Sequence, residues 1–359
     1  MQHIAPLLLS TLLVVLLTAC SSDSTDDGKG KGRTVRNLSL MLYAGTYDDI
    51  TPSASHRAQP FVSFDALSPR MSDAAASIHC FMTHATGVDF QGDFSYTGSS
   101  SWFSKIPLDD GTYQVYGFMP ASELSKVTID KQTKYETGAV ITATGLPALT
   151  ASDPCVIVGV GAGDGHTSLA DMTSKLGSFS YNAGTEGDHL YVLLDHLYAA
   201  LHLRLNIAEG YSELRTIKLT RLSLTAKSVK SVNVTATLTA GSANPLAVTT
   251  TSNTSGTGDE VVIYDGDEQQ LSPSSALDFL ACVAPGANQS FVLKTTYNVY
   301  DRNGNLIRKD RTTENTLTIP DGSKLTSGKK LIFRLTVNPT YIYVLSDPDL
   351  DDPKVTVVN

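Results

Sequence analysis

Alternation of apolar and polar residues with a period of two constrains the fold of this chain more than any other feature. Four segments show the pattern clearly: residues 38–42, 201–207, 232–238 and 331–337. Successive side chains of a β-strand point to opposite faces, so each segment presents one apolar face to a core and one mostly polar face to solvent. Charged residues make up only 18% of the chain, and abundant Thr, Val and Tyr favour strands over helices. The sequence therefore predicts an all-β protein built of sandwiches.

Turn-forming residues divide the chain into shorter pieces. Asp301–Asn305 contains the dipeptide Asn-Gly between two strand-like segments, which is the strongest short signal of a β-hairpin. The cluster at 182–188 predicts a break between two domains, 34–185 and 186–359, each long enough to bury a core. Residues 239–259 are rich in Ser, Thr, Asn and Gly, and we interpret them as a long exposed loop.

The N-terminus carries an export signal. Residues 7–17 form an apolar run that is short for a membrane span and suits the central region of a signal peptide. The run ends at Leu17-Thr18-Ala19-Cys20, which resembles the lipobox of bacterial lipoproteins. The resemblance implies a signal peptide at 1–19, lipidation of Cys20, palmitate included, and an outer-membrane lipoprotein at the cell surface. Polar residues 20–33 predict a flexible tether. A membrane helix that stays attached is the alternative interpretation of the run.

Three further cysteines lie among apolar neighbours: Cys80, Cys155 and Cys282. This setting is typical of small buried hydrophobic side chains, and it favours that role over redox or metal chemistry. At most one disulfide can form among the three, and the sequence leaves open whether any pair does.

No motif supports catalysis or cofactor binding. Val158–Gly165 is rich in glycine but does not fit Gly-x-Gly-x-x-Gly in any register, so we expect a strand that runs into a turn. His196 and His202 would lie about 20 Å apart on one continuous strand, which favours structural roles for them and for His189. The acidic residues at 347–352 lack the spacing of a calcium-binding loop. We therefore expect no enzyme activity, no cofactor and no metal site.

The charge of the chain also excludes one class of partner. The formal net charge is −9, and no block of Lys or Arg is present. Nucleic acid is therefore not expected to bind.

Several loose motifs follow one another in a characteristic order. They are an isolated alternating strand at 34–44, a polar loop with Arg57-Ala58, the aromatic segment Asp110–Pro120, the His-containing segment Leu193–Leu201, and closing strands at 295–300 and 328–331. In this order and spacing, the chain resembles the fimbrillins of Bacteroidia type V pili. The resemblance implies two tandem transthyretin-like β-sandwich domains. It also implies a structural subunit of a cell-surface fimbrium that is assembled by protease-triggered strand exchange and contributes to adhesion.

The same resemblance implies partners and processing sites. An arginine-specific maturation protease would cut between Arg57 and Ala58, with Arg33, Arg36 and Arg70 as competing positions. The partners are other fimbrial subunits, the outer membrane through the lipid anchor, and a host or bacterial surface receptor. Candidate donor-strand residues near the C-terminus are Tyr341, Ile342, Tyr343, Val344, Leu345, Val355 and Val357. Two alternatives stay open: a tip or accessory adhesin lipoprotein of the same fold, and a surface glycan-binding lipoprotein.

Overall fold

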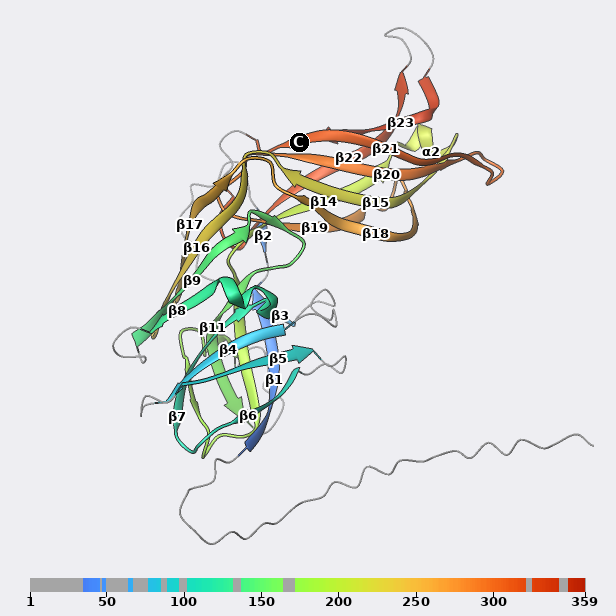
Figure 1. The fold of residues 1–359 in the computed structure, drawn as a ribbon. Coiled ribbons are helices and arrows are strands. Elements are labelled where there is room, and N and C mark those ends of the chain that lie inside the picture. The colour runs from blue at the N-terminus through green and yellow to red at the C-terminus, as the bar shows by residue number, and fades with distance from the viewer. Residues whose placement is uncertain are drawn as a thin grey trace, which may run out of the picture. The chain divides into compact units, whose positions relative to one another are not determined.

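The computed structural model describes residues 35–45, 47–49, 64–66, 77–84, 89–96, 102–131, 137–163, 172–320, 325–341 and 348–358. Contacts divide the chain into two units, Met1–Arg33 and Thr34–Asn359, and all described residues belong to the second unit. Within this unit the described chain is almost entirely β-structure, which confirms the predicted fold class (Figure 1). Its short helical elements include the 3-10 helix Ala121–Lys126 and α2, Glu209–Ser212.

Sheet A contains the strands of the first part of the chain and one from the middle. Its strands are β1 (Val35–Gly45), β3 (Phe64–Ala66), β4 (Ser77–His84), β5 (Asp89–Tyr96), β6 (Trp102–Pro107), β7 (Thr112–Met119), β11 (Cys155–Gly163), β12 (Ser180–Asn182) and β13 (His189–His196). They are ordered β11-β13-β1-β6-β5-β4-β7-β12, and β7 also pairs with β11, so the sheet closes on itself. Alternate side chains of these strands form one buried cluster, to which β1 contributes Leu38, Leu40 and Leu42.

Sheet C covers part of the opposite face of sheet A. It consists of β8 (Val127–Lys131), β9 (Gly138–Pro147), β16 (Val229–Thr239) and β17 (Leu246–Ser255), in the order β17-β16-β9-β8. A second buried cluster joins Phe118, Val156 and Leu193 of sheet A to Ile141 and Val234 of sheet C. Along β7, β11 and β13, alternate side chains therefore pack into two different cores, one on each face of the sheet.

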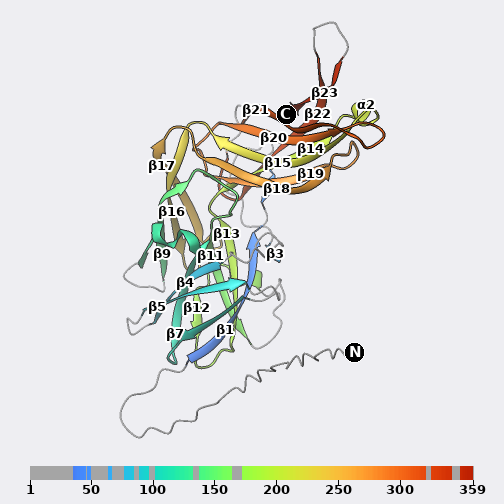
Figure 2. The ribbon, with the colours of Figure 1, turned by 45° about the vertical axis from the view of Figure 1, so that its right-hand side comes forward.

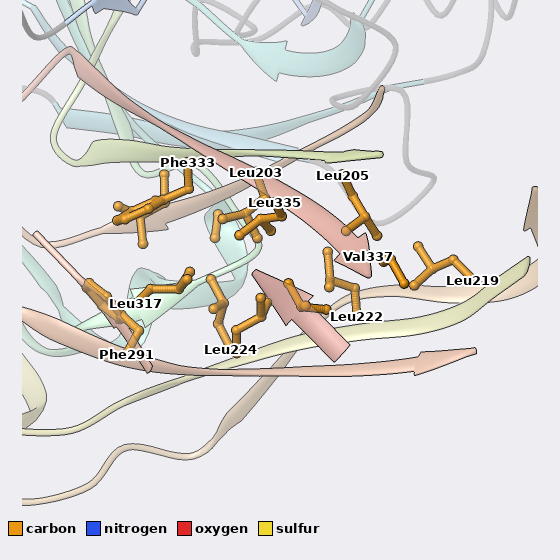
Figure 3. Close-up of a cluster of buried hydrophobic side chains, with 14 of the residues drawn as sticks. Leu203, Leu205, Leu219, Leu222, Leu224, Phe291, Leu317, Phe333, Leu335 and Val337 are labelled. Atoms are coloured by element: carbon orange, nitrogen blue, oxygen red, sulfur yellow. The ribbon is translucent and has the colours of Figure 1, made fainter. Parts of the chain in front are cut away.

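Sheets B and D form a sandwich. Sheet B contains β2 (Asp48–Asp49), β10 (Leu149–Thr150), β14 (Ala199–Ile207), β19 (Leu277–Val283), β22 (Lys329–Tyr341) and β23 (Pro348–Val358). Sheet D contains β15 (Thr216–Ala226), β18 (Glu260–Gln270), β20 (Ser290–Tyr300) and β21 (Leu306–Thr318). Figure 3 shows Leu203, Leu205 and Leu335 of sheet B facing Leu222 and Leu224 of sheet D. This third cluster is the sandwich core that the alternating segments predict.

The expected division at residues 185 and 186 does not coincide with a break between sheets. β13 follows this point in the sequence but pairs with β1 and β11, and β16 and β17 complete sheet C with β8 and β9 (Figure 2). The cluster at 182–188 is a turn between β12 and β13. A turn signal reports a local reversal of the chain, whichever sheets its flanking strands join.

Residues 239–259 are not the long loop expected from their composition. Residues 246–255 form β17, which pairs with β16 from Val229↔Ser255 to Leu238↔Leu246. Most of its Thr, Ser and Asn side chains are exposed, so apolar alternation gives no signal, although Thr has a high propensity for strands. The hairpin at Asp301–Asn305 is confirmed: the Asp301 backbone N–H donates to the Asn305 carbonyl over 2.9 Å between β20 and β21.

Candidate functional site

The first strand, β1, is the candidate functional element of sheet A, because it is paired on both sides. It pairs parallel with β13 from Ser39↔His189 to Ala44↔Leu194. On its other side it pairs antiparallel with β6 from Val35↔Pro107 to Leu40↔Trp102, and with β3 at its end. The N-terminal strand thus lies between strands that follow it in the sequence. Its removal would leave backbone donors and acceptors of both neighbours unpaired.

The side chains of β1 are anchored in the core of sheet A. Leu38 and Leu40 are completely buried, and Leu42 is buried beside them. Full burial of one leucine side chain stabilises a fold by about 1.5–3 kcal/mol. In the absence of β1, the core side chains that cover Leu38, Leu40 and Leu42 would therefore line a hydrophobic groove.

Ion pairs secure the beginning of β1. The Arg36 guanidinium lies 3.2 Å from Asp110 and 3.6 Å from Asp188. Arg36, one of the competing cleavage positions, is thus inside a strand, as the alternating pattern predicts. A backbone paired on both sides is a poor protease substrate.

The end of β1 is held by a buried polar junction. The Tyr47 ring stacks on the His196 imidazole with centroids 3.8 Å apart, and its hydroxyl donates to Asp153 Oδ1 over 2.7 Å. His196 Nε2 donates to the Gly45 carbonyl, and His196 Nδ1 lies 2.9 Å from Asp153 Oδ2. These contacts join the segment after β1 to the start of β11 and the end of β13.

The electrostatics of the junction follow from burial and from one carboxylate. Burial opposes a charge on His196, but the adjacent Asp153 outweighs it and raises the pKa of His196 to about 9. Burial raises the pKa of Asp195 to about 6. Burial also raises the pKa of the Tyr47 hydroxyl and of the Cys155 thiol, so both groups keep their protons. Tyr47 is accordingly a donor to Asp153.

The strand β2 carries the N-terminal segment on to sheet B. It pairs parallel with β22 through Asp48↔Lys329 and Asp49↔Lys330. The Lys329 ammonium lies 2.7 Å from Asp48, and the Lys330 ammonium lies 3.2 Å from Asp49. Residues 35–49 therefore contact both sheet A and sheet B.

Several residues singled out by the sequence lie outside the described residues. They are Cys20, Arg33, Arg57, Ala58, Arg70, Ile342, Tyr343, Val344 and Leu345. Tyr341 ends β22, where only its backbone is described. Val355 and Val357 lie on β23 and pair with Val337 and Leu335 of β22. Val355 is buried in the core between sheets B and D, and its carbonyl accepts from Asn315 Nδ2 over 2.8 Å.

Within the described part of the chain, the histidines and cysteines that the sequence singled out occupy structural positions, with one exception. His202 lies on β14 and pairs with Asp278 over 2.7 Å. His196 is the last residue of β13, so the two histidines lie on different strands. Cys80, Cys155 and Cys282 are buried, as their apolar neighbours predict, and no disulfide joins any two of them. The exception is the junction of Tyr47, Asp153 and His196, which sequence reasoning missed because its members come from three distant segments.

In the described part of the chain, no helix has the length and apolar character needed to cross a membrane.

The known proteins that resemble this chain resemble it in structure, at low sequence identity. No protein-family model and no curated protein matches the sequence. A candidate cell adhesion protein from Bacteroides fragilis is 12% identical with a TM-score of 0.44, over 90% of this chain and 97% of that chain. A fimbrial protein from Bacteroides vulgatus is 13% identical with a TM-score of 0.31, over 90% and 98%. The fimbrial anchor protein Mfa2 from Porphyromonas gingivalis is 11% identical with a TM-score of 0.25, over 90% and 96%.

Proposed function

We propose that this chain is a non-enzymatic structural subunit of a cell-surface fimbrium, exported as a lipoprotein through Cys20 and assembled by strand exchange. The observation that supports this most directly is the position of β1, which is paired on both edges within sheet A. The chain reaches Arg57 shortly after this strand and β2. One cut there separates the segment that carries β1 and β2 from the rest of the chain.

The proposed cut would convert a satisfied sheet into an acceptor. Loss of β1 exposes the pairing edge of β13 along His189–Leu194 and the apolar surface that covers Leu38, Leu40 and Leu42. Unpaired strand edges are templates for pairing with another chain. An extended segment of a second subunit would satisfy the backbone groups and fill the groove in one step.

The C-terminal region offers the donor in this proposal. Residues 341–345 are apolar at every position, and Val355 and Val357 alternate with polar residues on β23. In the free chain β23 is an outer strand that pairs with β22 alone through its backbone ladder. Outer strands detach with fewer broken hydrogen bonds than central ones.

The test is treatment of the purified chain with an arginine-specific protease. We expect a first cut that leaves Ala58 as the new N-terminus, followed by polymers of high mass. The matched variant Arg57→Lys keeps the positive charge but is not a substrate, and it should stay monomeric. First cleavage at another arginine with Arg57 intact, or assembly of the Arg57→Lys variant at the wild-type rate, would contradict the proposal.

A further inference from the structure

Three side chains with metal-binding atoms converge beneath the Tyr47 ring. Asp153, Cys155 and His196 each offer one ligand atom, and these atoms all lie within 4.8 Å of one another. Cys155 begins β11 and lies directly opposite His196 in the antiparallel ladder, while Asp153 precedes Cys155 by two residues. We propose that these three residues form a binding site for a divalent transition-metal ion of the zinc class.

The distances suit tetrahedral coordination. Zinc binds imidazole nitrogen at about 2.0–2.1 Å and thiolate sulfur at about 2.3 Å, which places two such ligands about 3.5 Å apart. Cys155 Sγ lies 3.6 Å from His196 Nδ1. His196 Nδ1 lies 2.9 Å from Asp153 Oδ2, a hydrogen-bonding separation that must open by about half an ångström to admit the ion.

Hydrogen bonds to the outer atoms of the ligands orient them as metal sites require. A ligating histidine normally donates its other ring N–H to a carbonyl or carboxylate, and a ligating carboxylate is itself hydrogen-bonded. His196 donates from Nε2 to the Gly45 carbonyl, which leaves Nδ1 on the side of Cys155 and Asp153. The free carboxylate oxygen of Asp153 accepts from the Tyr47 hydroxyl over 2.7 Å.

The charge balance of this buried place permits occupancy. Binding replaces the thiol proton of Cys155 and the Nδ1 proton of His196 by the ion, and both protons leave to solvent. The thiolate and the Asp153 carboxylate then neutralise the two positive charges of the ion. Cys155 and His196 are buried, so a neutral ion–ligand group avoids the desolvation cost of a lone charge.

The experiment uses Co²⁺ as a spectroscopic probe, added to the folded full chain and also during refolding. We expect one Co²⁺ per chain, visible d–d bands of tetrahedral geometry, a near-ultraviolet thiolate-to-cobalt band, and displacement of Co²⁺ by Zn²⁺. Cys155→Ser should abolish the thiolate band. Tyr47→Phe keeps the stacked ring and removes the hydroxyl that contacts Asp153 and Cys282, so we expect affinity to fall about 10–100-fold through the lost bond to Asp153.

Two controls make the outcome decisive. Cys80→Ser removes a buried thiol that is not one of the three proposed ligands and should leave the spectrum unchanged. Cys282 Sγ lies 3.5 Å from the Tyr47 hydroxyl, so a chain with Cys282→Ala identifies which thiol gives the band. Failure of the wild-type chain to bind Co²⁺ in either protocol would overturn the proposal. A thiolate band that persists in Cys155→Ser would overturn it as well. Neither result depends on cleavage at Arg57, so the test is independent of the proposed function.

Discussion

At the scale of single residues, Leu40 shows how strongly β1 is held. Its side chain is fully buried in the cluster enclosed by sheet A. Truncation of a buried leucine to alanine removes apolar contacts and leaves a cavity, which together cost about 2–5 kcal/mol. We expect Leu40→Ala to lower the free energy of unfolding in urea by that amount. Val35→Ala is the control on the same strand, because Val35 is 61% exposed, and its effect should be near zero.

Glu268 predicts a pH dependence of stability. Hydrogen bonds from Lys218, Tyr300 and Asn298 lower the pKa of its carboxyl from 4.5 to about 2. The folded state therefore prefers the carboxylate, and this contribution is present above the unfolded pKa and is lost as pH falls from 4.5 toward 2. Urea unfolding at pH 6 and at pH 3 should show a smaller acid loss for Glu268→Gln than for the wild type.

The control for this pH effect lies on the opposite edge strand of the same sheet. Glu314 is exposed on β21, so Glu314→Gln makes the same chemical change away from the Lys218, Asn298 and Tyr300 donors. It should retain the acid loss of the wild type. Equal acid losses in wild type and Glu268→Gln would show that these hydrogen bonds do not favour the carboxylate.

Residue chemistry alone did not reveal the junction at the end of β1. His196 was recognisable as one histidine of a strand pattern, and Cys155 as a small buried side chain. Neither residue has a metal-ligand partner at a motif spacing, because Tyr47, Asp153 and His196 meet only through the pairing of β1, β11 and β13. Local spacing cannot report a contact between segments so far apart in the chain.

At the scale of elements, β11 explains the glycine-rich segment that the sequence singled out. Residues 175–178 cross its backbone closely: Gly177 N–H donates to the Val158 carbonyl over 2.8 Å, and Val160 N–H donates to the Ser178 carbonyl over 2.6 Å. A Cβ on Gly159 would lie 2.6 Å from the Lys175 carbonyl oxygen. The glycine therefore permits close backbone contact within a strand. The expected strand is present up to Gly163, and the residues expected to form the turn after it lie outside the described residues.

Gly159→Ala tests this account of β11. The added methyl group must displace the backbone at Lys175, and overpacking of this kind costs about 1–3 kcal/mol. We expect a lower melting temperature in circular dichroism. Gly210→Ala is the matched control, since a methyl group on Gly210 in α2 would meet no atom within 4 Å apart from its chain neighbours and the backbone of its own helix. If Gly159→Ala melted at the temperature of the wild type, residues 175–178 would not be tightly packed against the backbone of β11.

The strands differ in how well the sequence predicts them. β14, β16 and β22 were predictable because each buries every second side chain. β17 was not, because its two faces are mostly exposed and its conformation is imposed by pairing with β16. The neighbours of β1 were equally beyond prediction, since parallel pairing with β13 leaves no mark in either segment.

At the scale of the whole described chain, β22 joins the two ends of the fold. β2, from the N-terminal segment, pairs with its first residues, and β23, from the C-terminus, pairs with Arg334–Tyr341. Both outer segments are therefore attached to one strand of sheet B. Detachment of either segment leaves part of the β22 edge unpaired.

Deletion of residues 348–359 tests whether the tail acts between subunits. The sandwich core keeps all of its members except those of β23, so we expect the truncated chain to fold. The loss of buried Val355 should lower the free energy of unfolding by about 1.5–3 kcal/mol. If the tail is the donor, cleavage by the arginine-specific protease should proceed and polymers should not form.

A point variant separates loss of the tail from loosening of the tail. Asn315→Ala removes the hydrogen bond to the Val355 carbonyl, which should cost about 0.5–1.5 kcal/mol and leave the tail available. This variant should still polymerise after cleavage, because a loosened β23 detaches more easily and remains present to pair. Normal polymerisation of the truncated chain would exclude residues 348–359 as the donor and leave residues 341–345 as the remaining candidate.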